Sequence, residues 1–202
     1  MPAHALVATT REALLDAAAA LLQDVGWASF SFRDLAERVG IRAPSIHYHF
    51  PTKADLGIAL VGRMREQRHE HEAELTHRFP NPRDRLLALG KMIEDEICRG
   101  QKSCPIYAFQ AEFSILPPAV QRLVRAWIDD CLAGLARWLE EGRQRGVLSF
   151  NGPAAQQALV VWAVLQQGTQ LHRTHPDMSY GLLIQQLVAT ISHASTPSGP
   201  TP

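Results

Sequence analysis

The sequence lacks several features that membrane and secreted proteins carry. Its longest purely apolar run, Ala158–Leu165, has eight residues, whereas a helix that crosses a bilayer needs about 20. The N-terminus has no basic start followed by an apolar run and a cleavage site, so no signal peptide is expected. The three cysteines, Cys98, Cys104 and Cys131, follow no regular spacing, which disfavours a disulfide framework. We therefore expect a cytoplasmic protein with no membrane partner.

An excess of charge of one sign is also missing. The 20 Lys and Arg residues balance the 20 Asp and Glu residues, and the formal net charge is zero. Within residues 1–55 there are five cationic and six anionic side chains. A strongly basic coat for nucleic acid is therefore excluded, and any DNA binding must come from the local placement of a few groups.

The short motifs of the common enzyme classes are absent as well. We find no glycine-rich phosphate loop, no His-Glu-x-x-His and no nucleophile elbow. The segment His69–Glu72, with Glu74 and His77 after it, leaves a small all-helical enzyme or metal protein as a rival hypothesis. However, His69 and His71 are two positions apart on a helix and face different ways, which favours a solvated helix face. We expect no enzyme, no metal and no cofactor.

Helical periodicity is what the sequence does have, along nearly its whole length, and no segment alternates convincingly as a strand does. Gly26 and Gly40 suit helix ends, and Ser31 and Thr52 suit helix starts. Helices are expected at residues 10–25, 32–39, 43–49, 53–78, 82–99, 105–115, 118–145, 153–173 and 179–193. The sequence therefore predicts an all-α protein of about nine helices.

Three zones follow from this pattern. Residues 1–52 are expected to form a compact three-helix domain, and residues 53–194 a larger helical body that the long fourth helix joins to it. The tail, residues 195–202, is rich in Pro, Ser and Thr and poor in apolar residues. It is expected to be disordered, because it cannot bury enough apolar surface.

Residues 32–49 have the spacing of a helix-turn-helix, a DNA-reading device of two short helices joined by a tight turn. Counting from Phe32, the small Ala36 is fifth, Gly40 is ninth and the aliphatic Ile46 is fifteenth. Ala36 allows close approach of the second helix, Gly40 can adopt the left-handed conformation of the turn, and Ile46 can be buried. The alternative, a plain helical hairpin in a bundle, does not explain the polar outer face of residues 42–49.

The runs FRDLAERVGI (32–41), PSIHYHF (44–50) and KADL (53–56) resemble the DNA-binding domain of the TetR-type transcriptional regulators. The resemblance implies an all-helical homodimer that binds a palindromic DNA operator, usually as a repressor. It also implies that a small-molecule effector, bound in the C-terminal body, releases the DNA. The motif covers about residues 10–60, and the remainder is similar to the family in length and helix order.

The resemblance also implies which residues contact DNA. The second helix would enter the major groove, where hydroxyl and imidazole groups can bond phosphate oxygens or base edges. The family usually has tyrosine at position 47 and often a capping serine at position 42; here Arg42 can instead reach a guanine or a phosphate. The expected DNA-binding residues are Arg33, Arg42, Ala43, Ser45, His47, Tyr48, His49 and Lys53.

Two C-terminal helices carry more apolar surface than one packing partner requires, and a four-helix interface between two chains would use it. Gly168 in the middle of the first of them indicates a close helix crossing. The expected interface residues are Ala158, Val161, Leu165, Gly168, Leu183 and Leu187. An internal core helix is the alternative.

Aromatic and apolar residues of the body suggest a site for an apolar or aromatic effector. The candidate residues are Met92, Ile97, Cys104, Tyr107, Phe109, Phe113, Trp127 and Trp162. Ordinary core packing is the alternative for each aromatic residue. Cys104 precedes Pro105 at a helix start near two cations, which lowers the pKa of a thiol in general. A thiol-based sensor of electrophiles or oxidants is therefore a further hypothesis, alongside an inert cysteine.

Overall fold

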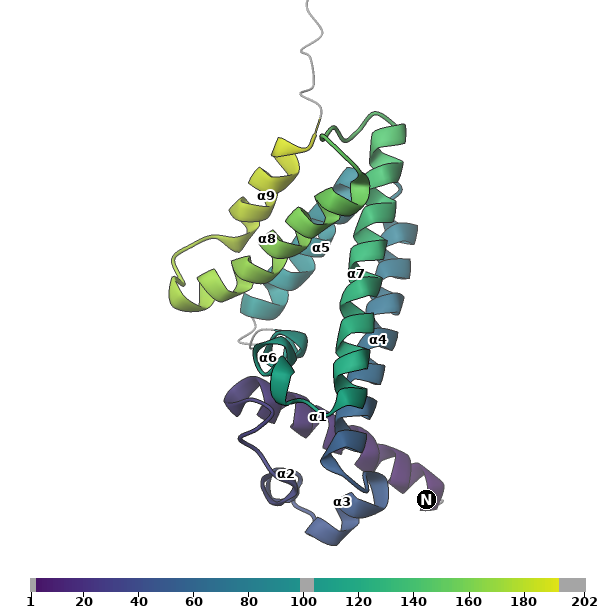
Figure 1. Cartoon of the computed structure of the whole chain (residues 1–202), viewed down its shortest axis with the longest axis vertical. Helices are drawn as coiled ribbons and strands as arrows, with labels where there is room; N and C mark the ends of the chain where they lie inside the picture. The colour runs from purple at the N-terminus through teal and green to yellow at the C-terminus, as the bar shows by residue number, and fades with distance from the viewer. Residues whose placement is uncertain (1–2, 99–103, 193–202) are drawn as a thin grey trace, which may run out of the picture. The chain divides into compact units, whose positions relative to one another are not determined.

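The computed structural model describes residues 3–98 and 104–192, with the side chains of residues 10–96 and 104–192. Within these residues the chain has nine α-helices, one 3₁₀ helix and no strand (Figure 1). This confirms the expected all-α fold. The helices are α1 (Ala3–Val25), α2 (Phe32–Val39), α3 (Ala43–His49), α4 (Lys53–Arg78), α5 (Pro82–Cys98), α6 (Pro105–Ala111), η1 (Phe113–Ile115), α7 (Pro118–Gln144), α8 (Ala154–Thr174) and α9 (Tyr180–Thr190). None of these described helices is both long and apolar enough to cross a membrane.

Two helices differ from the sequence-based expectation. Helix α1 begins at Ala3 rather than at residue 10. Residues 3–9 include three alanines, which favour a helix, but they form no apolar stripe that periodicity could detect. The helix expected at 105–115 is divided into α6 and η1, because the backbone of Glu112 leaves the helical region at φ −108° and ψ 21°.

The chain forms two compact units, and α4 and α7 each contribute residues to both. Unit 1 comprises residues 1–70 with 101–129, and unit 2 comprises residues 71–100 with 130–202. This division follows packing alone, so the expected functional boundary after residue 52 stays a prediction. The expected disordered tail, residues 195–202, lies outside the described residues.

The core of unit 1 joins the first three helices to α6 and to parts of α4 and α7. Helix α1 packs against α2 and α6, and α2 packs against α3. Its buried apolar side chains come from every one of these elements: Leu14, Leu15, Ala18, Leu22, Trp27, Phe30, Leu35, Ala36, Ile46, Phe50, Leu56, Leu60, Val61, Met64, Ile106, Phe109, Leu116, Val120, Val124 and Trp127. Burying one such large side chain contributes about 1.5–3 kcal/mol, so packing holds the short helices in place.

The core of unit 2 uses the residues that were expected to form a dimer interface. Ala158, Val161 and Leu165 of α8 are at most 5% exposed in the single chain, and Gly168 is also buried. A side chain that is already buried gains nothing from a second copy of the chain. The alternative, an internal core helix, therefore describes this face of α8 in the single chain, and the dimer interface expected on these six residues stays a prediction. Leu187 of α9 is half-buried against the same core, and Leu183 is half-buried beside Gly168.

Close helix crossings explain two glycines of unit 2. A Cβ atom at Gly168 would lie 2.8 Å from Leu183 Cδ2 and 2.9 Å from the Tyr180 ring, which confirms the close crossing expected there. A Cβ at Gly90 of α5 would lie 2.5 Å from Ile184 Cγ2. Helices α5 and α8 both pack on α9, and a larger residue at either glycine would separate a pair of helices.

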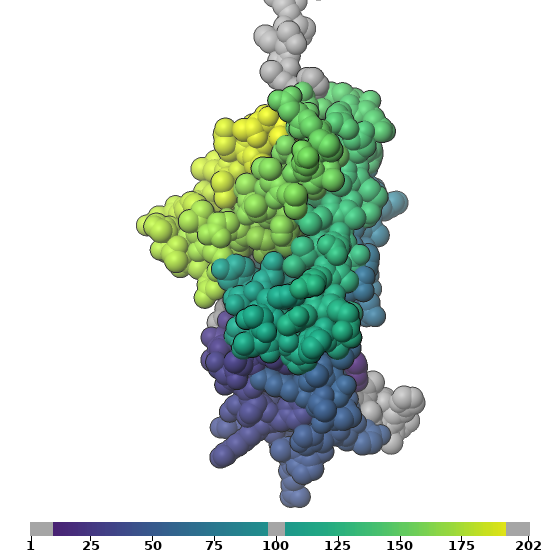
Figure 2. Space-filling view, in the orientation of Figure 1, coloured from purple at the N-terminus to yellow at the C-terminus, as the bar shows by residue number. Residues whose placement is uncertain are grey.

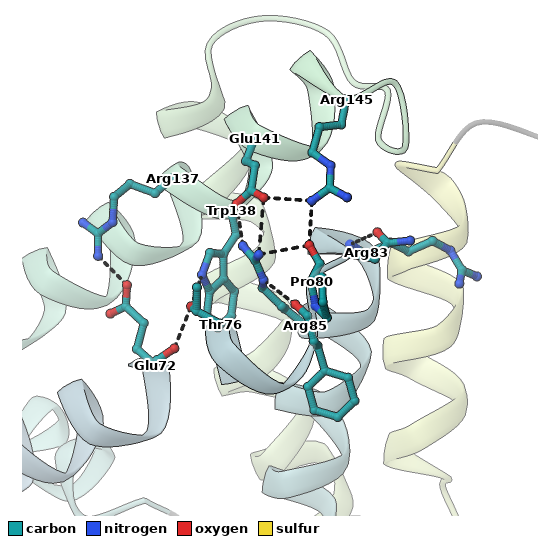
Figure 3. Close-up of polar contacts among 11 residues, drawn as sticks. Glu72, Thr76, Pro80, Arg83, Arg85, Arg137, Trp138, Glu141 and Arg145 are labelled. Carbon is teal, nitrogen blue, oxygen red and sulfur yellow. Dashed lines mark hydrogen bonds and ion pairs between the residues drawn. The ribbon is translucent and has the colours of Figure 1, made fainter. Parts of the chain in front are cut away.

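A buried arginine fixes the turn between α4 and α5 in unit 2 (Figure 3). Arg85, which is 4% exposed, pairs with the carboxylate of Glu141. Its Nε donates to the Phe79 carbonyl at 2.7 Å and its Nη2 to the Pro80 carbonyl at 3.0 Å. Arg145 donates to the same Pro80 carbonyl at 2.6 Å and to Glu141 at 3.0 Å. The hydrogen bonds from Arg85 lower the pKa of Glu141.

We predict that Arg85→Met lowers the free energy of unfolding by about 3 kcal/mol, because two turn carbonyls and a carboxylate lose their donor. Urea denaturation at neutral pH measures it. The control is Arg83→Met, whose side chain is 43% exposed and should change stability by less than about 1 kcal/mol. Because the folded-state pKa of Glu141 is depressed, the ion pair stabilises at neutral pH and is lost as the pH falls. The effect of Arg85→Met should therefore shrink in acid; equal effects of both variants would contradict this role.

Candidate nucleic-acid interface

The start of α2 is fixed by a capping box. The Ser31 hydroxyl accepts from the backbone N–H of Arg33 at 3.2 Å and of Asp34 at 3.4 Å. The Asp34 carboxylate accepts from the N–H and the O–H of Ser31, both at 2.7 Å. These hydrogen bonds lower the pKa of Asp34, so the charged form of Asp34 supports the cap.

The turn between α2 and α3 has the geometry expected from its glycine. Gly40 has φ 74° and ψ 32°, the left-handed conformation. The N–H groups of Gly40 and Ile41 both donate to the Ala36 carbonyl, at 2.9 and 3.0 Å. The roles expected for Gly40 in the turn and for Ala36 in close packing are confirmed, since Ala36 is buried.

One side of helix α3 packs in the core of unit 1, and the other side faces solvent. Ile46 is fully buried and Phe50, just after the helix, is 2% exposed. On the other side, Ser45, His47 and Tyr48 are exposed, and Tyr48 keeps 75% of its surface. Figure 2 shows α2 and α3, in violet and blue, as the uncovered lower edge of unit 1 on this face.

The remaining expected contact residues frame this surface. Arg33 of α2 is exposed, as is Arg42, which begins α3 without a capping side-chain hydrogen bond. Ala43 and His49 are half-buried. The His49 ring packs edge-on against Tyr48, with their centroids 5.2 Å apart. Unit 1 thus brings seven of the eight expected DNA-binding residues to α2 and α3.

His47 is oriented by two contacts. Its Nδ1 lies 3.2 Å from the carbonyl oxygen of Pro51. Its ring meets the Phe32 ring edge-on, with the centroids 5.1 Å apart. The imidazole is therefore held between α2 and the start of α4.

The eighth expected residue, Lys53, is used inside the unit. Its ammonium donates to the carbonyls of Trp27 and Phe30 and lies over both of their rings, 4.8 and 4.3 Å from the centroids. Burial lowers the pKa of Lys53, against the opposite effect of the charges of Glu112 and Asp34. Lys53 therefore holds the α1–α2 turn, and its contact with a DNA phosphate stays a prediction.

Sequence reasoning missed Glu112, which also holds this turn. Its carboxylate accepts from the Ala28 N–H at 2.8 Å. It also fills the space beside Gly26, where φ is 86° and a Cβ atom would overlap it. The Trp27 ring packs on Phe109 of α6, with their centroids 5.5 Å apart. The two bonded residues are 84 positions apart, and no local pattern pointed to their pairing.

The expected effector residues fall in both units. Cys104, Tyr107, Phe109, Phe113 and Trp127 belong to unit 1, and Met92, Ile97 and Trp162 belong to unit 2. Phe109 and Trp127 are buried, whereas Cys104, Tyr107, Phe113, Met92 and Trp162 are half-buried. The side chain of Ile97 lies outside the described residues. Their role in effector binding, and the reactivity of Cys104, stay predictions.

The described part of the chain holds no group of three or more His, Cys, Asp or Glu side chains placed to bind a metal ion. His69 and His71 of α4 are both exposed. The geometry therefore offers no observation in favour of the metal-protein hypothesis.

Comparison with known proteins agrees with this geometry. The family model for bacterial regulatory proteins of the tetR family matches residues 14–60. The model for the tetracyclin repressor-like C-terminal domain matches residues 82–188. The first match spans the capping box, the turn and α3.

Individual proteins are similar over most or part of the chain. The HTH-type transcriptional repressor NemR of Escherichia coli K12 is 27% identical over 158 residues, which are 77% of this chain and 79% of NemR. The tetracycline repressor protein class C of Escherichia coli is 41% identical over 61 residues, 30% of this chain and 28% of that protein. The crystal structure of a TetR-family transcriptional regulator from Agrobacterium tumefaciens, 28% identical, superposes with a TM-score of 0.87 over 92% of this chain and 99% of its own.

We predict that Lys53→Met lowers the free energy of unfolding by about 1–3 kcal/mol, because two carbonyls lose their donor. Any weakening of DNA binding should then be the same at every salt concentration. The control is the exposed Arg33→Met, which should leave stability unchanged. If Arg33 contacts a phosphate, its removal lowers the slope of log affinity against log salt by about one per subunit. A lowered slope for Lys53→Met would show a phosphate contact instead of an internal role.

Proposed function

Because the chain belongs to the TetR family of bacterial transcriptional regulators, we propose that it is a one-component repressor that binds a palindromic operator as a homodimer. Regulators of this family bind DNA and are not enzymes. One observation carries the proposal: α3 is anchored by Ile46 and Phe50 and presents Ser45, His47 and Tyr48 to solvent. We expect the protein to act in the cytoplasm, where bacterial DNA lies.

Helix α3 suits the major groove in size and chemistry. Its seven residues span about 10 Å, in a groove about 12 Å wide. The hydroxyls of Ser45 and Tyr48 can donate to or accept from base edges and phosphates, and the Tyr48 ring can contact a thymine methyl. We expect the exposed Arg33 and Arg42 to bond the flanking phosphates or a guanine, and the half-buried Ala43 and His49 to lie at the edges of the contact.

We infer that dimerisation uses the exposed apolar face of α8 and α9 rather than the buried face. Leu159, Val160 and Leu171 of α8 and Leu182 of α9 are between 38% and 65% exposed. Such side chains are costly to leave in water when they lie together on one unit. Of these residues Leu182 also lines a groove on α9, together with Met178, Ser179, Leu183, Gln185, Gln186 and Ala189. Two copies related by a two-fold axis would present two α3 helices to two operator half-sites.

We further propose that a small apolar or aromatic effector releases the operator. Two separate candidate sites support an apolar ligand: the half-buried Tyr107 and Phe113 of unit 1, and the half-buried Met92 and Trp162 of unit 2. Partly exposed aromatic and thioether groups gain contacts when a ligand covers them. NemR, which is similar to this chain, is a transcriptional repressor, and this supports repression as the direction of regulation proposed here.

The experiment that tests DNA recognition is a gel shift with the DNA that flanks the gene of this protein, followed by selection from a randomised duplex library. We predict that Tyr48→Ala weakens binding to the selected duplex at least tenfold, because it removes the most exposed ring of α3. Tyr48→Phe should keep the ring contact and lose only hydrogen bonding. Gln67→Ala, an exposed change on α4, should bind as the wild type does. Unchanged binding by Tyr48→Ala would show that the surface is assigned wrongly.

We predict that Leu182→Arg converts the dimer into monomers, because it places a charge in the proposed apolar interface. Sedimentation velocity measures the oligomeric state, and binding to a palindromic duplex should fall with it. The matched control is Ile115→Arg, since Ile115 is 59% exposed on η1 and lies outside the proposed interface. A Leu182→Arg variant that stays dimeric would remove α9 from the interface.

A further inference from the structure

His47 has a defined tautomer in the neutral state. A backbone carbonyl only accepts hydrogen bonds, so the contact of Nδ1 with the Pro51 carbonyl at 3.2 Å places a hydrogen on Nδ1. The edge-on contact with Phe32 keeps the ring in this orientation. In the neutral ring, Nε2 then carries a lone pair and no hydrogen.

This tautomer decides what the exposed imidazole can bind. A neutral His47 offers Nε2 only as an acceptor, which a phosphate oxygen repels. A protonated His47 donates from both nitrogens and carries a positive charge, which makes its hydrogen bond to a phosphate charge-assisted. Among side chains, histidine is the one that ordinarily changes its charge between about pH 5 and 8.

Resting on the DNA-binding function proposed above, we propose that His47 couples operator binding to the uptake of a proton. In the complex, Nδ1–H donates to the Pro51 carbonyl and Nε2–H donates to an oxygen of the DNA backbone. The phosphate supplies the negative charge that favours the imidazolium, and each subunit takes up one proton. Operator affinity therefore rises as the pH falls.

The carboxylates Asp34 and Asp55, on the elements around His47, have other hydrogen-bond partners, so we assign the negative charge beside the imidazolium to the DNA. On α2, Asp34 accepts from Ser31 and Arg38 pairs with Asp24, while Arg33 and Glu37 are exposed. At the start of α4, Asp55 accepts from the Thr52 hydroxyl at 2.7 Å, and Lys53 donates to main-chain carbonyls.

On α3 itself the titratable or charged neighbours are Arg42, Tyr48 and His49, and the ring of His49 packs on Tyr48. His49 is the second histidine of the surface and therefore provides the matched control for any effect of pH.

The test measures the affinity of the full-length dimer for the selected duplex by fluorescence anisotropy from pH 5.5 to 8.5 at constant ionic strength. Uptake of one proton changes affinity by up to about tenfold per pH unit, and two subunits can double this slope. We expect wild-type affinity to fall as the pH rises. His47→Gln keeps an amide N–H near the position of Nε2 without titrating, so it should flatten the slope. His49→Gln should keep the wild-type slope, whatever its affinity.

Calorimetric titration in two buffers of different ionisation enthalpy counts the protons taken up directly. About one proton fewer per subunit in His47→Gln than in the wild type supports the proposal. An unchanged slope in His47→Gln, or a slope that vanishes only in His49→Gln, overturns it. An affinity that rises with pH also overturns it and shows instead that neutral Nε2 accepts from a base amino group. If the protein selects no duplex at any pH, the DNA-binding proposal itself is wrong, and this result differs from a failure of the proton-uptake proposal alone.

Discussion

The turn between α1 and α2 is the constraint on which the proposed DNA-reading surface depends. Lys53, the first residue of α4, donates to the carbonyls of Trp27 and Phe30 in this turn. Glu112, just after α6, accepts from the Ala28 N–H of the same turn. The turn therefore cannot move without breaking a charge-assisted hydrogen bond, and these are worth more than neutral ones. Residues from three distant parts of the chain meet at one short loop of unit 1.

The short helices need this support because they are not stable alone. Helices α2 and α3 have eight and seven residues, and isolated helices shorter than about 12–15 residues are marginal in water. Caps at Ser31 and Thr52 define where α2 and α4 begin, and Ile46 anchors α3. The position of α2 is set at its start by the α1–α2 turn. A shift of α6 or η1 would reach the α1–α2 turn through Glu112, and this is the route within unit 1 that we propose for an effector.

The helix-turn-helix could be predicted because its signals are local, whereas contacts between residues far apart in the sequence could not. Ser31, Gly40 and Thr52 act on their own neighbours, so their roles follow from a few adjacent residues. Lys53 and Glu112 depend on partners 26 and 84 positions away, and no pattern in one sequence reveals such pairs. Helix α8 shows a related limit. Periodicity identified its apolar stripes, but it could not tell that the chain's own core covers Ala158 while Leu159, next in sequence, faces solvent.

The even balance of charge shapes how such a protein can recognise DNA. With five cationic and six anionic side chains in residues 1–55, and one of the cations held inside by two carbonyls, electrostatic attraction to the backbone is weak. Affinity must then come from a few well-placed donors, and each counts for more. A symmetric dimer would present each of those donors twice. Because the charges of each copy nearly balance, the second copy would add no positive net charge that strengthens binding to random DNA. In the proposal made above, His47 adds to these donors a positive charge at its contact with a phosphate.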